Sequence, residues 1–161
     1  RFEWGPRALG ARSIIADPSR GDMKDIVNTK IKFREPFRPF APSVLVDAAS
    51  RYFELDDPAR HYPARFMLYV VDVKPGQGAK LPAITHVDNT ARLQTVHKAH
   101  SPLYYGLIER FGQASGIPVI LNTSFNLKGE PIVTTPAQAH STFARSGMDA
   151  LVLGNSLVTK R

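Results

Sequence analysis

The sequence has 161 residues and contains no cysteine, so disulfides and thiolate metal sites are excluded. No apolar run approaches the ~18 residues that a membrane-spanning helix needs, and no signal-peptide pattern opens the sequence. Dense Lys/Arg blocks, paired catalytic carboxylates, a Ser-His-Asp order and a G-x-S-x-G elbow are absent as well. We therefore expect a cytoplasmic protein without membrane contacts, and none of the common hydrolase sites.

The composition is that of one globular domain with an excess of positive charge. Hydrophobic residues make up 43% and charged residues 22%, which is near the globular average. The formal net charge is +7 and the sequence pI is about 9.9, so an anionic partner is expected. The arginines stand singly or in pairs beside glycines and prolines. This spacing favours a pocket for a small anion over a surface for nucleic acid.

Apolar periodicity and turn residues predict strands and helices that are mixed without strict alternation. Residues 1–20 are expected to form a loop. Helices are expected over 22–32, 47–55, 102–115 and 136–146. Strands are expected over 43–46, 65–73, 91–98 and 119–121, with a closing hairpin over 150–160 that turns at Gly154-Asn155. These elements predict an α+β domain with a twisted mixed sheet.

A polar cluster follows the apolar strand 119–121 directly. It consists of Asn122, Thr123, Ser124 and Asn126, arranged around a single phenylalanine. In extended geometry Ser124 and Asn126 point to the same side, and Phe125 points into the core. Hydroxyls and amides at the end of a strand can bind phosphate oxygens. The alternative is a turn whose Asn and Ser side chains bond their own backbone.

A second candidate lies in "NTKIKFREPFRPFAPSV", where Lys32 and Arg34 are two residues apart. In an extended segment the two side chains share one face and form a cationic clamp, to which Arg38 is close in sequence. Arginine supplies a bidentate fork and lysine a mobile point charge, which suits a polyphosphate. The alternative is a solvated basic loop in which Arg34 pairs with Glu35 or Asp25.

Two further stretches combine arginine with small or polar residues. In "WGPRALGARS", Arg7 and Arg12 stand among glycines, so exposed guanidinium groups and free backbone amides are expected to form an anion-binding concavity. The stretch lacks the spacing of a P-loop. In "HVDNTARLQTV", Arg92 is a candidate anion ligand, whereas His86 and Asp88 fall short of a metal site and suggest a loop-to-strand junction.

Four segments together resemble a known family. "EWGPRALGARSIIADP", "REPFRPFAPSV", "HVDNTARLQTV" and "PVILNTSFNLKGEPIV" resemble, in the same order and over nearly the whole chain, the C-terminal domain of the NodU-type O-carbamoyltransferases. That domain is YrdC-like. Its K-x-R and T-S-x-N patterns match residues 32–34 and 123–126 here. The resemblance implies a YrdC-like twisted mixed sheet with flanking helices and a basic concave face.

The resemblance also implies a reaction and a set of site residues. A YrdC-like domain converts carbamoyl phosphate and ATP, with Mg²⁺, into carbamoyl adenylate. A metal-binding N-terminal actin-like domain then passes the carbamoyl group to an acceptor hydroxyl. Residues 1–20 would be the junction with that missing domain, and residues 21–161 the YrdC-like domain. The implied catalytic residues are Lys32, Arg34, Ser124 and Asn126. The implied substrate- and nucleotide-binding residues are Arg7, Arg12, Arg38, Arg92, Asn122 and Thr123, and no metal ligand is assigned in this chain.

The expected partners are carbamoyl phosphate, ATP and the absent N-terminal domain, with a homodimer as an alternative to a monomer. Two other functions stay open. One is a threonylcarbamoyl-adenylate synthase that acts in tRNA modification, against which the "GPRALG" and "FRPFAP" motifs argue. The other is a non-enzymatic RNA-binding module, which the basic charge alone would support.

Overall fold

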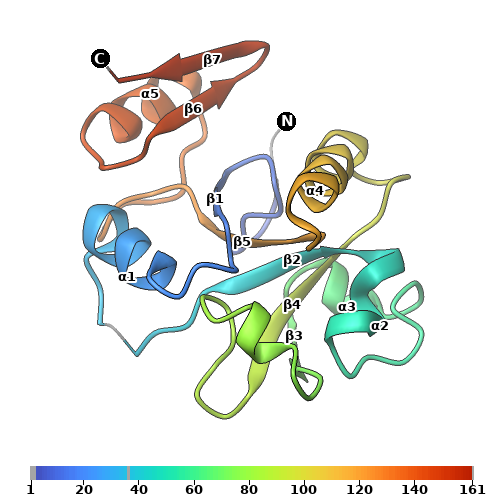
Figure 1. Ribbon diagram of the computed structural model, residues 1–161. Coiled ribbons are helices and arrows are strands. Elements are labelled where there is room, and N and C mark those ends of the chain that lie inside the picture. The colour runs from blue at the N-terminus through green and yellow to red at the C-terminus, as the bar shows by residue number, and fades with distance from the viewer. Residues whose placement is uncertain (1–2, 36, 161) are drawn as a thin grey trace.

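A five-stranded mixed sheet forms the centre of the computed structural model, which describes residues 3–35 and 37–160 (Figure 1). Its strands are β1 (Ser13–Ala16), β2 (Ala41–Leu45), β3 (Tyr69–Asp72), β4 (Thr90–Val96) and β5 (Val119–Ser124). They lie in the order β1-β5-β2-β4-β3. β2 and β4 are parallel, and the other neighbouring pairs are antiparallel. The α+β architecture expected from the sequence is confirmed.

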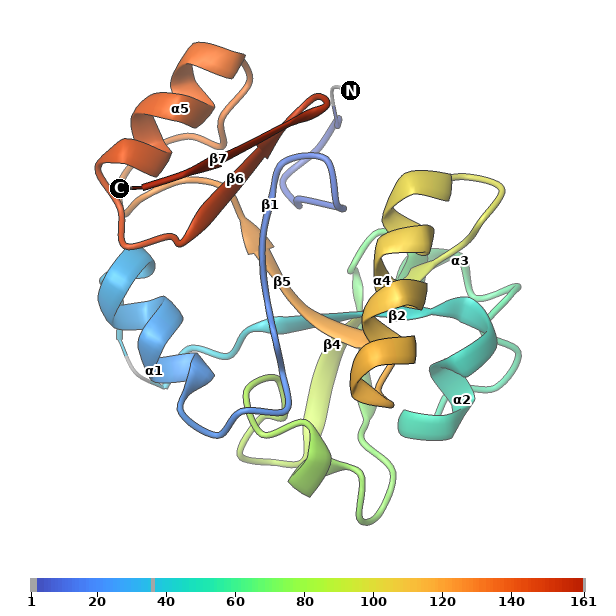
Figure 2. The ribbon, with the colours of Figure 1, turned by 45° about the horizontal axis from the view of Figure 1, so that its top comes forward.

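The helices are short apart from α4 and α5. They are α1 (Met23–Val27), which continues as a π-helical turn (Asn28–Lys32), α2 (Ala49–Tyr52) after a 3-10 turn (Val46–Ala48), α3 (Tyr62–Arg65), a 3-10 turn (Gly78–Lys80), α4 (Pro102–Ser115) and α5 (Pro136–Ala144). A hairpin of β6 (Ala150–Leu153) and β7 (Ser156–Thr159) ends the chain beside α5, outside the main sheet (Figure 2). No helix of the described residues is long and apolar enough to cross a membrane.

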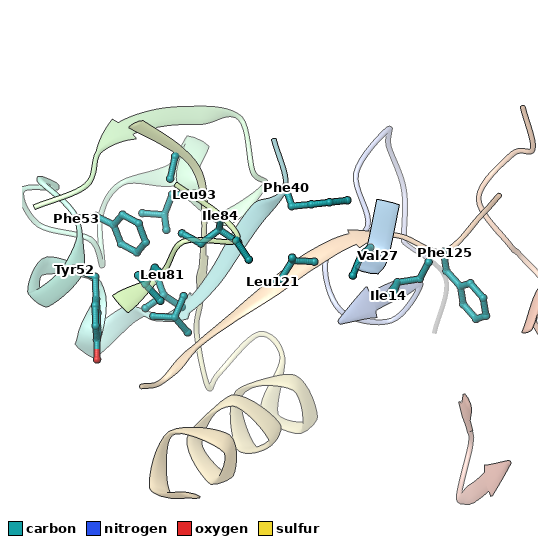
Figure 3. Close-up of a cluster of buried hydrophobic side chains, with 14 of the residues drawn as sticks. Ile14, Val27, Phe40, Tyr52, Phe53, Leu81, Ile84, Leu93, Leu121 and Phe125 are labelled. Atoms are coloured by element: carbon teal, nitrogen blue, oxygen red, sulfur yellow. The ribbon is translucent and has the colours of Figure 1, made fainter. Parts of the chain in front are cut away.

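The two faces of the sheet differ in how they are covered. On one face Ile14, Val44, Leu93 and Leu121 belong to the larger apolar core, which runs from α2 to the end of β5 (Figure 3). On the other face, one end packs against α4, where Ile120 joins Ile108 in a smaller apolar cluster. Strand pairing and alternation place Ser43, Arg92, Gln94, Asn122 and Ser124 on this same α4 face. The polar side chains therefore share this face with the apolar cluster under α4, and Ser43, Gln94 and Asn122 are buried there.

Several boundaries follow from local chemistry and were correctly predicted. Pro102 stands at the first turn of α4, and Gly116 ends that helix with φ +79°. Thr135 caps α5 in a capping box with Gln138. The closing hairpin turns at Gly154, whose φ is +61°.

Three expectations about secondary structure were wrong. Residues 1–20 are not all loop, because Ser13–Ala16 forms β1 and pairs with the end of β5. A four-residue strand has too little pattern to be recognised, and it exists because β5 supplies backbone partners. The strand predicted over 65–73 is confined to β3, since Tyr62–Arg65 forms α3 with a proline in its first turn. The helix predicted over 47–55 is reduced to a 3-10 turn and the four residues of α2.

Candidate functional site: a cationic pocket on the open face of the sheet

The open part of the α4 face carries a pocket of about 80 Å³ between β2, β4, β5 and the loop before β1. Its lining residues are Pro6, Arg7, Ala8, Arg34, Pro39, Phe40, Ala41, Met67, Arg92, Asn122, Thr123 and Ser124. Among the described residues that line it, three are arginines and none is acidic. Pockets that enclose drug-sized ligands measure roughly 300–1,000 Å³. The enclosed space therefore suits a phosphate-sized anion, and a nucleotide would extend beyond it.

The three arginines of the pocket are short of partners. The buried Nε atoms of Arg7, Arg34 and Arg92 have no hydrogen-bond partner among the described residues. Burial lowers the pKa of Arg92, and the charges of Arg7 and Arg34 lower it further. Burial also lowers the pKa of Arg34, whose guanidinium lies 4.5 Å from the centre of the Phe40 ring. A bound anion would reduce the repulsion between these like charges, which have no counter-charge among the described residues of the pocket lining.

Lys32 lies beside the pocket and binds the end of β5. Its Nζ donates to the main-chain oxygens of Ser124 and Asn126, to Ser124 Oγ at 3.3 Å and to Asn126 Oδ1 at 2.9 Å. Burial, followed by the charge of Arg34, lowers the pKa of Lys32 to about 7. The four oxygens act in the opposite direction, because each accepts a hydrogen bond from the ammonium form. Burial and hydrogen bonding therefore act on the pKa of Lys32 in opposite directions.

The extended geometry expected to place Lys32 and Arg34 on one face is not found. The segment is not extended, because Lys32 ends a π-helical turn and Phe33 follows with φ +47°. The side chain of Asn28 holds the main chain of Arg34 through two hydrogen bonds. Asn28 Nδ2 donates to Arg34 O at 2.5 Å, and Asn28 Oδ1 accepts from Arg34 N at 3.2 Å. Lys32 thereby turns to the end of β5, and Arg34 turns into the pocket. The alternative in which Arg34 pairs with Glu35 is wrong. Glu35 pairs with Arg38 instead, with Arg38 Nε 2.9 Å from Glu35 Oε2.

The loop that precedes β1 folds around the carboxylate of Glu3. The main-chain amides of Leu9 and Ala11 donate to the two Glu3 carboxylate oxygens at 3.0 and 2.9 Å. The anion-binding concavity expected here is present, but the anion it holds is a side chain of the same loop. Arg12 was expected to be exposed and is instead 8% exposed, with its Nη2 donating to Glu3 O. Arg12 therefore supports the loop that carries Arg7.

A buried polar network fastens this loop to the sheet. Asn122 Nδ2 donates to Ala8 O at 3.1 Å, to Ser43 Oγ at 3.0 Å and to Gln94 Oε1 at 2.9 Å. Gln94 Nε2 donates to Leu9 O at 3.0 Å, and Ser43 Oγ donates to Gln94 Oε1 at 2.6 Å. The sequence analysis did not consider Ser43 for the site, and it left Gln94 without a role although Gln94 lies in the same polar stretch as Arg92. The available signal was the two-residue spacing of Arg92 and Gln94, which places both on one face of β4.

The end of β5 presents its polar residues as the alternation predicts. Asn122 and Ser124 lie on the pocket face, whereas Phe125 is 6% exposed and packs in the core. Ser124 Oγ donates to Asn126 Oδ1 at 2.6 Å, and Asn126 Nδ2 donates to Glu130 O at 2.7 Å. The end of β5 therefore has both the hydrogen bonds of a local turn and polar side chains on the pocket face. Thr123 lines the pocket, but its side chain projects from the opposite face of the strand.

Of the residues singled out from the sequence, the pocket brings together Arg7, Arg34, Arg92, Asn122, Thr123 and Ser124. Lys32 and Asn126 adjoin it through Ser124. Arg12 and Arg38 do not line it. His86 belongs to a loop-to-strand junction, where its Nδ1 lies 2.9 Å from Thr90 Oγ1. Within residues 3–35 and 37–160, no group of three or more carboxylate or histidine side chains is placed to hold a metal ion.

Comparison with known proteins agrees with these motifs. The family model described as "Carbamoyltransferase C-terminus" matches residues 1–160. The chain belongs to the carbamoyltransferase C-terminus family. It is 50% identical over its full length to 29% of nodulation protein NolO of Bradyrhizobium diazoefficiens. It is 40% identical over 86% of its length to 23% of nodulation protein U of Rhizobium tropici. An uncharacterized protein of Methanocaldococcus jannaschii is 44% identical over 99% of the chain and 30% of its own length. The chain thus spans less than a third of these relatives.

Proposed function

We propose that this domain, in a YrdC-like role, activates the carbamoyl group for an O-carbamoyltransferase, and that it acts on carbamoyl phosphate and ATP. The observation that carries the proposal is the pocket in which Arg7, Arg34 and Arg92 converge with no acidic side chain in the lining. Arginine forks bind phosphate oxygens in pairs, and the Nε atoms of these three arginines have no hydrogen-bond partner among the described residues, which supports the proposal. Membership of the carbamoyltransferase C-terminus family supplies the substrate class.

The proposed chemistry has two balanced steps. Water first cleaves carbamoyl phosphate to carbamate and inorganic phosphate. A carbamate oxygen then attacks the α-phosphorus of ATP, the bond to the β-phosphate breaks, and carbamoyl adenylate and pyrophosphate result. Both reactants of the second step are anions, so their approach is opposed by Coulomb repulsion. The three arginines and Lys32 lower that repulsion and hold the two reactants close together, which is the main catalytic device in phosphoryl transfer.

Mg²⁺ is expected to arrive with ATP and not to be held by this domain. Magnesium prefers carboxylate, phosphate and water oxygens, and the described residues that line the pocket include no carboxylate. The residues present do not fit a protein-bound magnesium site, so the ion would be carried by the phosphates of the substrate. The second metal implied by the family belongs, in this proposal, to the N-terminal actin-like domain. That domain would transfer the carbamoyl group to an acceptor hydroxyl.

The "GPRALG" and "FRPFAP" motifs and membership of the carbamoyltransferase C-terminus family favour this proposal over a threonylcarbamoyl-adenylate synthase. RNA binding without catalysis is the other alternative. A filter-binding assay with tRNA beside an ATP titration separates the two, since tight salt-sensitive RNA binding without ATP affinity would favour the RNA-binding module.

The proposal is tested by carbamoyl-phosphate-dependent exchange of labelled pyrophosphate into ATP, measured in the full-length protein. Lys32→Ala and Arg34→Ala are expected to abolish the exchange. Lys80→Ala and Arg60→Ala remove the same charges from exposed positions outside the pocket and are expected to leave it unchanged. Retention of most of the exchange in either pocket variant would contradict the assignment.

A further inference from the structure

Arg34 reaches the pocket from a loop and not from a strand of the sheet. Its Nε is buried without a hydrogen-bond partner among the described residues, and the adjacent Glu35 pairs with Arg38 instead. Its guanidinium lies over the Phe40 ring, 4.5 Å from the centre. A ring face attracts a cation electrostatically and constrains its direction less than a hydrogen bond does. The path of the main chain at residue 34 therefore decides whether the charge of Arg34 points into the pocket.

The main chain of Arg34 is held by the side-chain amide of Asn28. Asn28 Nδ2 donates to Arg34 O, and Asn28 Oδ1 accepts from Arg34 N. A main-chain N–H can only donate and a carbonyl can only accept, so these two partners fix which end of the amide is the nitrogen. The pairing resembles the one in which two residues of adjacent antiparallel strands exchange both of their main-chain hydrogen bonds. Asn28 thereby does for residue 34 what a neighbouring strand would do.

Asn28 also closes the turn that separates Lys32 from Arg34. Its main-chain oxygen accepts from Phe33 N at 2.6 Å, and Phe33 has a φ of +47°. The left-handed region is strained for a bulky residue, which keeps that conformation only where its surroundings hold it. The Phe33 side chain is 55% exposed, so the packing of its ring contributes little of that support. The hydrogen bonds of Asn28 to residues 33 and 34 hold the turn instead.

We infer that Asn28 is a positioning residue for the anion site, because it directs the guanidinium of Arg34 into the pocket. Asn28 is not among the residues that line the pocket, so it acts through Arg34 and not by contact with the anion. Lys32 is held separately, by oxygens of Ser124 and Asn126. Loss of the Asn28 amide should therefore release Arg34 and leave Lys32 at the end of β5. The inference rests on the proposed function only in that an anion occupies the pocket.

A double-mutant cycle in the full-length protein tests whether Asn28 acts through Arg34, with inorganic phosphate as the probe and calorimetry as the measurement. Arg34→Ala is expected to weaken phosphate binding by about 10- to 100-fold, because hydrogen bonds to charged groups are lost. Asn28→Ala is expected to weaken it by about 5- to 10-fold, since the guanidinium then points into the pocket for only part of the time. In the Arg34→Ala background, Asn28→Ala should change the affinity by less than about twofold, because the group that it positions is gone.

Asn89→Ala is the matched control for a general loss of stability. Asn89 precedes β4 with a φ of +62°, and its Nδ2 donates to Val73 O at 2.8 Å, so the same substitution removes the same kind of hydrogen bond outside the pocket lining. It is expected to lower the melting temperature as Asn28→Ala does and to leave phosphate affinity within about twofold of wild type. Asn28→Leu, which keeps the approximate shape of asparagine without its amide, is the second variant if Asn28→Ala does not fold.

Each outcome has a separate meaning. Wild-type phosphate affinity in a folded Asn28→Ala or Asn28→Leu protein would refute the role of Asn28. An equal loss with and without Arg34 would also refute it, because Asn28 would then act by another route. The same loss in Asn89→Ala would show that general loosening suffices and would overturn the inference. Phosphate binding that follows the cycle, in a protein without carbamoyl-phosphate-dependent pyrophosphate exchange, would refute the proposed function and leave the role of Asn28 standing.

Discussion

The ammonium nitrogen of Lys32 lies 2.9 Å from Oδ1 of Asn126, although 94 positions separate the two residues in the sequence. The same nitrogen contacts Ser124, so one lysine joins the turn after α1 to the end of β5. Burial and the nearby Arg34 lower its pKa to about 7. A bound phosphate would reverse that shift, because an adjacent negative charge favours the ammonium form.

Anion binding is therefore expected to depend on pH through Lys32. The pKa of about 7 in the free protein rises when the anion binds, so binding takes up a proton where Lys32 is neutral. The affinity for carbamoyl phosphate should fall by up to about tenfold per pH unit above pH 7, until the pKa of the bound state is reached. Calorimetry between pH 7 and 9, in buffers of different ionisation enthalpy, measures both the slope and the proton uptake.

Lys32→Met provides the control for this pH dependence. The variant should bind more weakly at pH 7 and show little slope over the same range, because methionine carries no titrating group. A flat profile in the wild-type protein, or an equal slope in Lys32→Met, would contradict the role of Lys32.

The Glu3 carboxylate is expected to hold Arg7 in the pocket. Glu3→Gln keeps the shape but loses the negative charge that the amides of Leu9 and Ala11 and the guanidinium of Arg12 contact. Hydrogen bonds to charged groups contribute about 1.5–3 kcal/mol, so the loop should open more readily. Anion affinity should drop by about tenfold, and the melting temperature should change little.

The control for Glu3 is a change of charge at an exposed acid in the same sheet. Asp72→Asn on β3 removes one negative charge away from the loop and should leave anion affinity within twofold. An unchanged affinity in Glu3→Gln would show that the loop keeps its position without the carboxylate.

ATP binding is expected to weaken with salt, because the pocket is built from charge. The Debye length falls from about 10 Å at 0.1 M salt to about 3 Å at 1 M, which screens the open side of the pocket. We expect about a tenfold loss of ATP affinity over this range in an equilibrium titration. Adenosine carries no phosphate and should bind with little salt dependence. An equal salt dependence of ATP binding and adenosine binding would argue against an electrostatic pocket.

Phe125 is expected to anchor the polar end of β5. Its side chain is 6% exposed and packs in the larger apolar core. Its two neighbours in the sequence, Ser124 and Asn126, both contact Lys32. Phe125→Ala should lower the free energy of unfolding by about 3–5 kcal/mol in urea denaturation. Phe37→Ala, at a ring that is 75% exposed, should change it by less than about 0.5 kcal/mol. A similar small loss in Phe125→Ala would show that the anchor is unimportant.

Much of the fold could be predicted where the signal is local. The ends of α4 were marked by Pro102 and Gly116, and the start of α5 by Thr135, because capping and turn chemistry act over a few residues. β1 could not be recognised, because Ser13–Ala16 is a strand through its pairing with β5. The different directions of the Lys32 and Arg34 side chains could not be predicted either. They depend on the φ of +47° at Phe33 and on the hydrogen bond from Asn28 Nδ2 to Arg34 O.

The sequence by itself determined the chemical inventory of this protein: a basic domain without cysteine, polar residues at the end of an apolar strand, and arginines beside glycines. These properties lie in the residue types and in spacings of two to four residues. Only the tertiary structure decided which of these groups meet. It brought Arg7, Arg34 and Arg92 to one pocket and paired Arg38 with Glu35. Contacts between distant segments depend on strand order and loop packing, which no short stretch of sequence encodes.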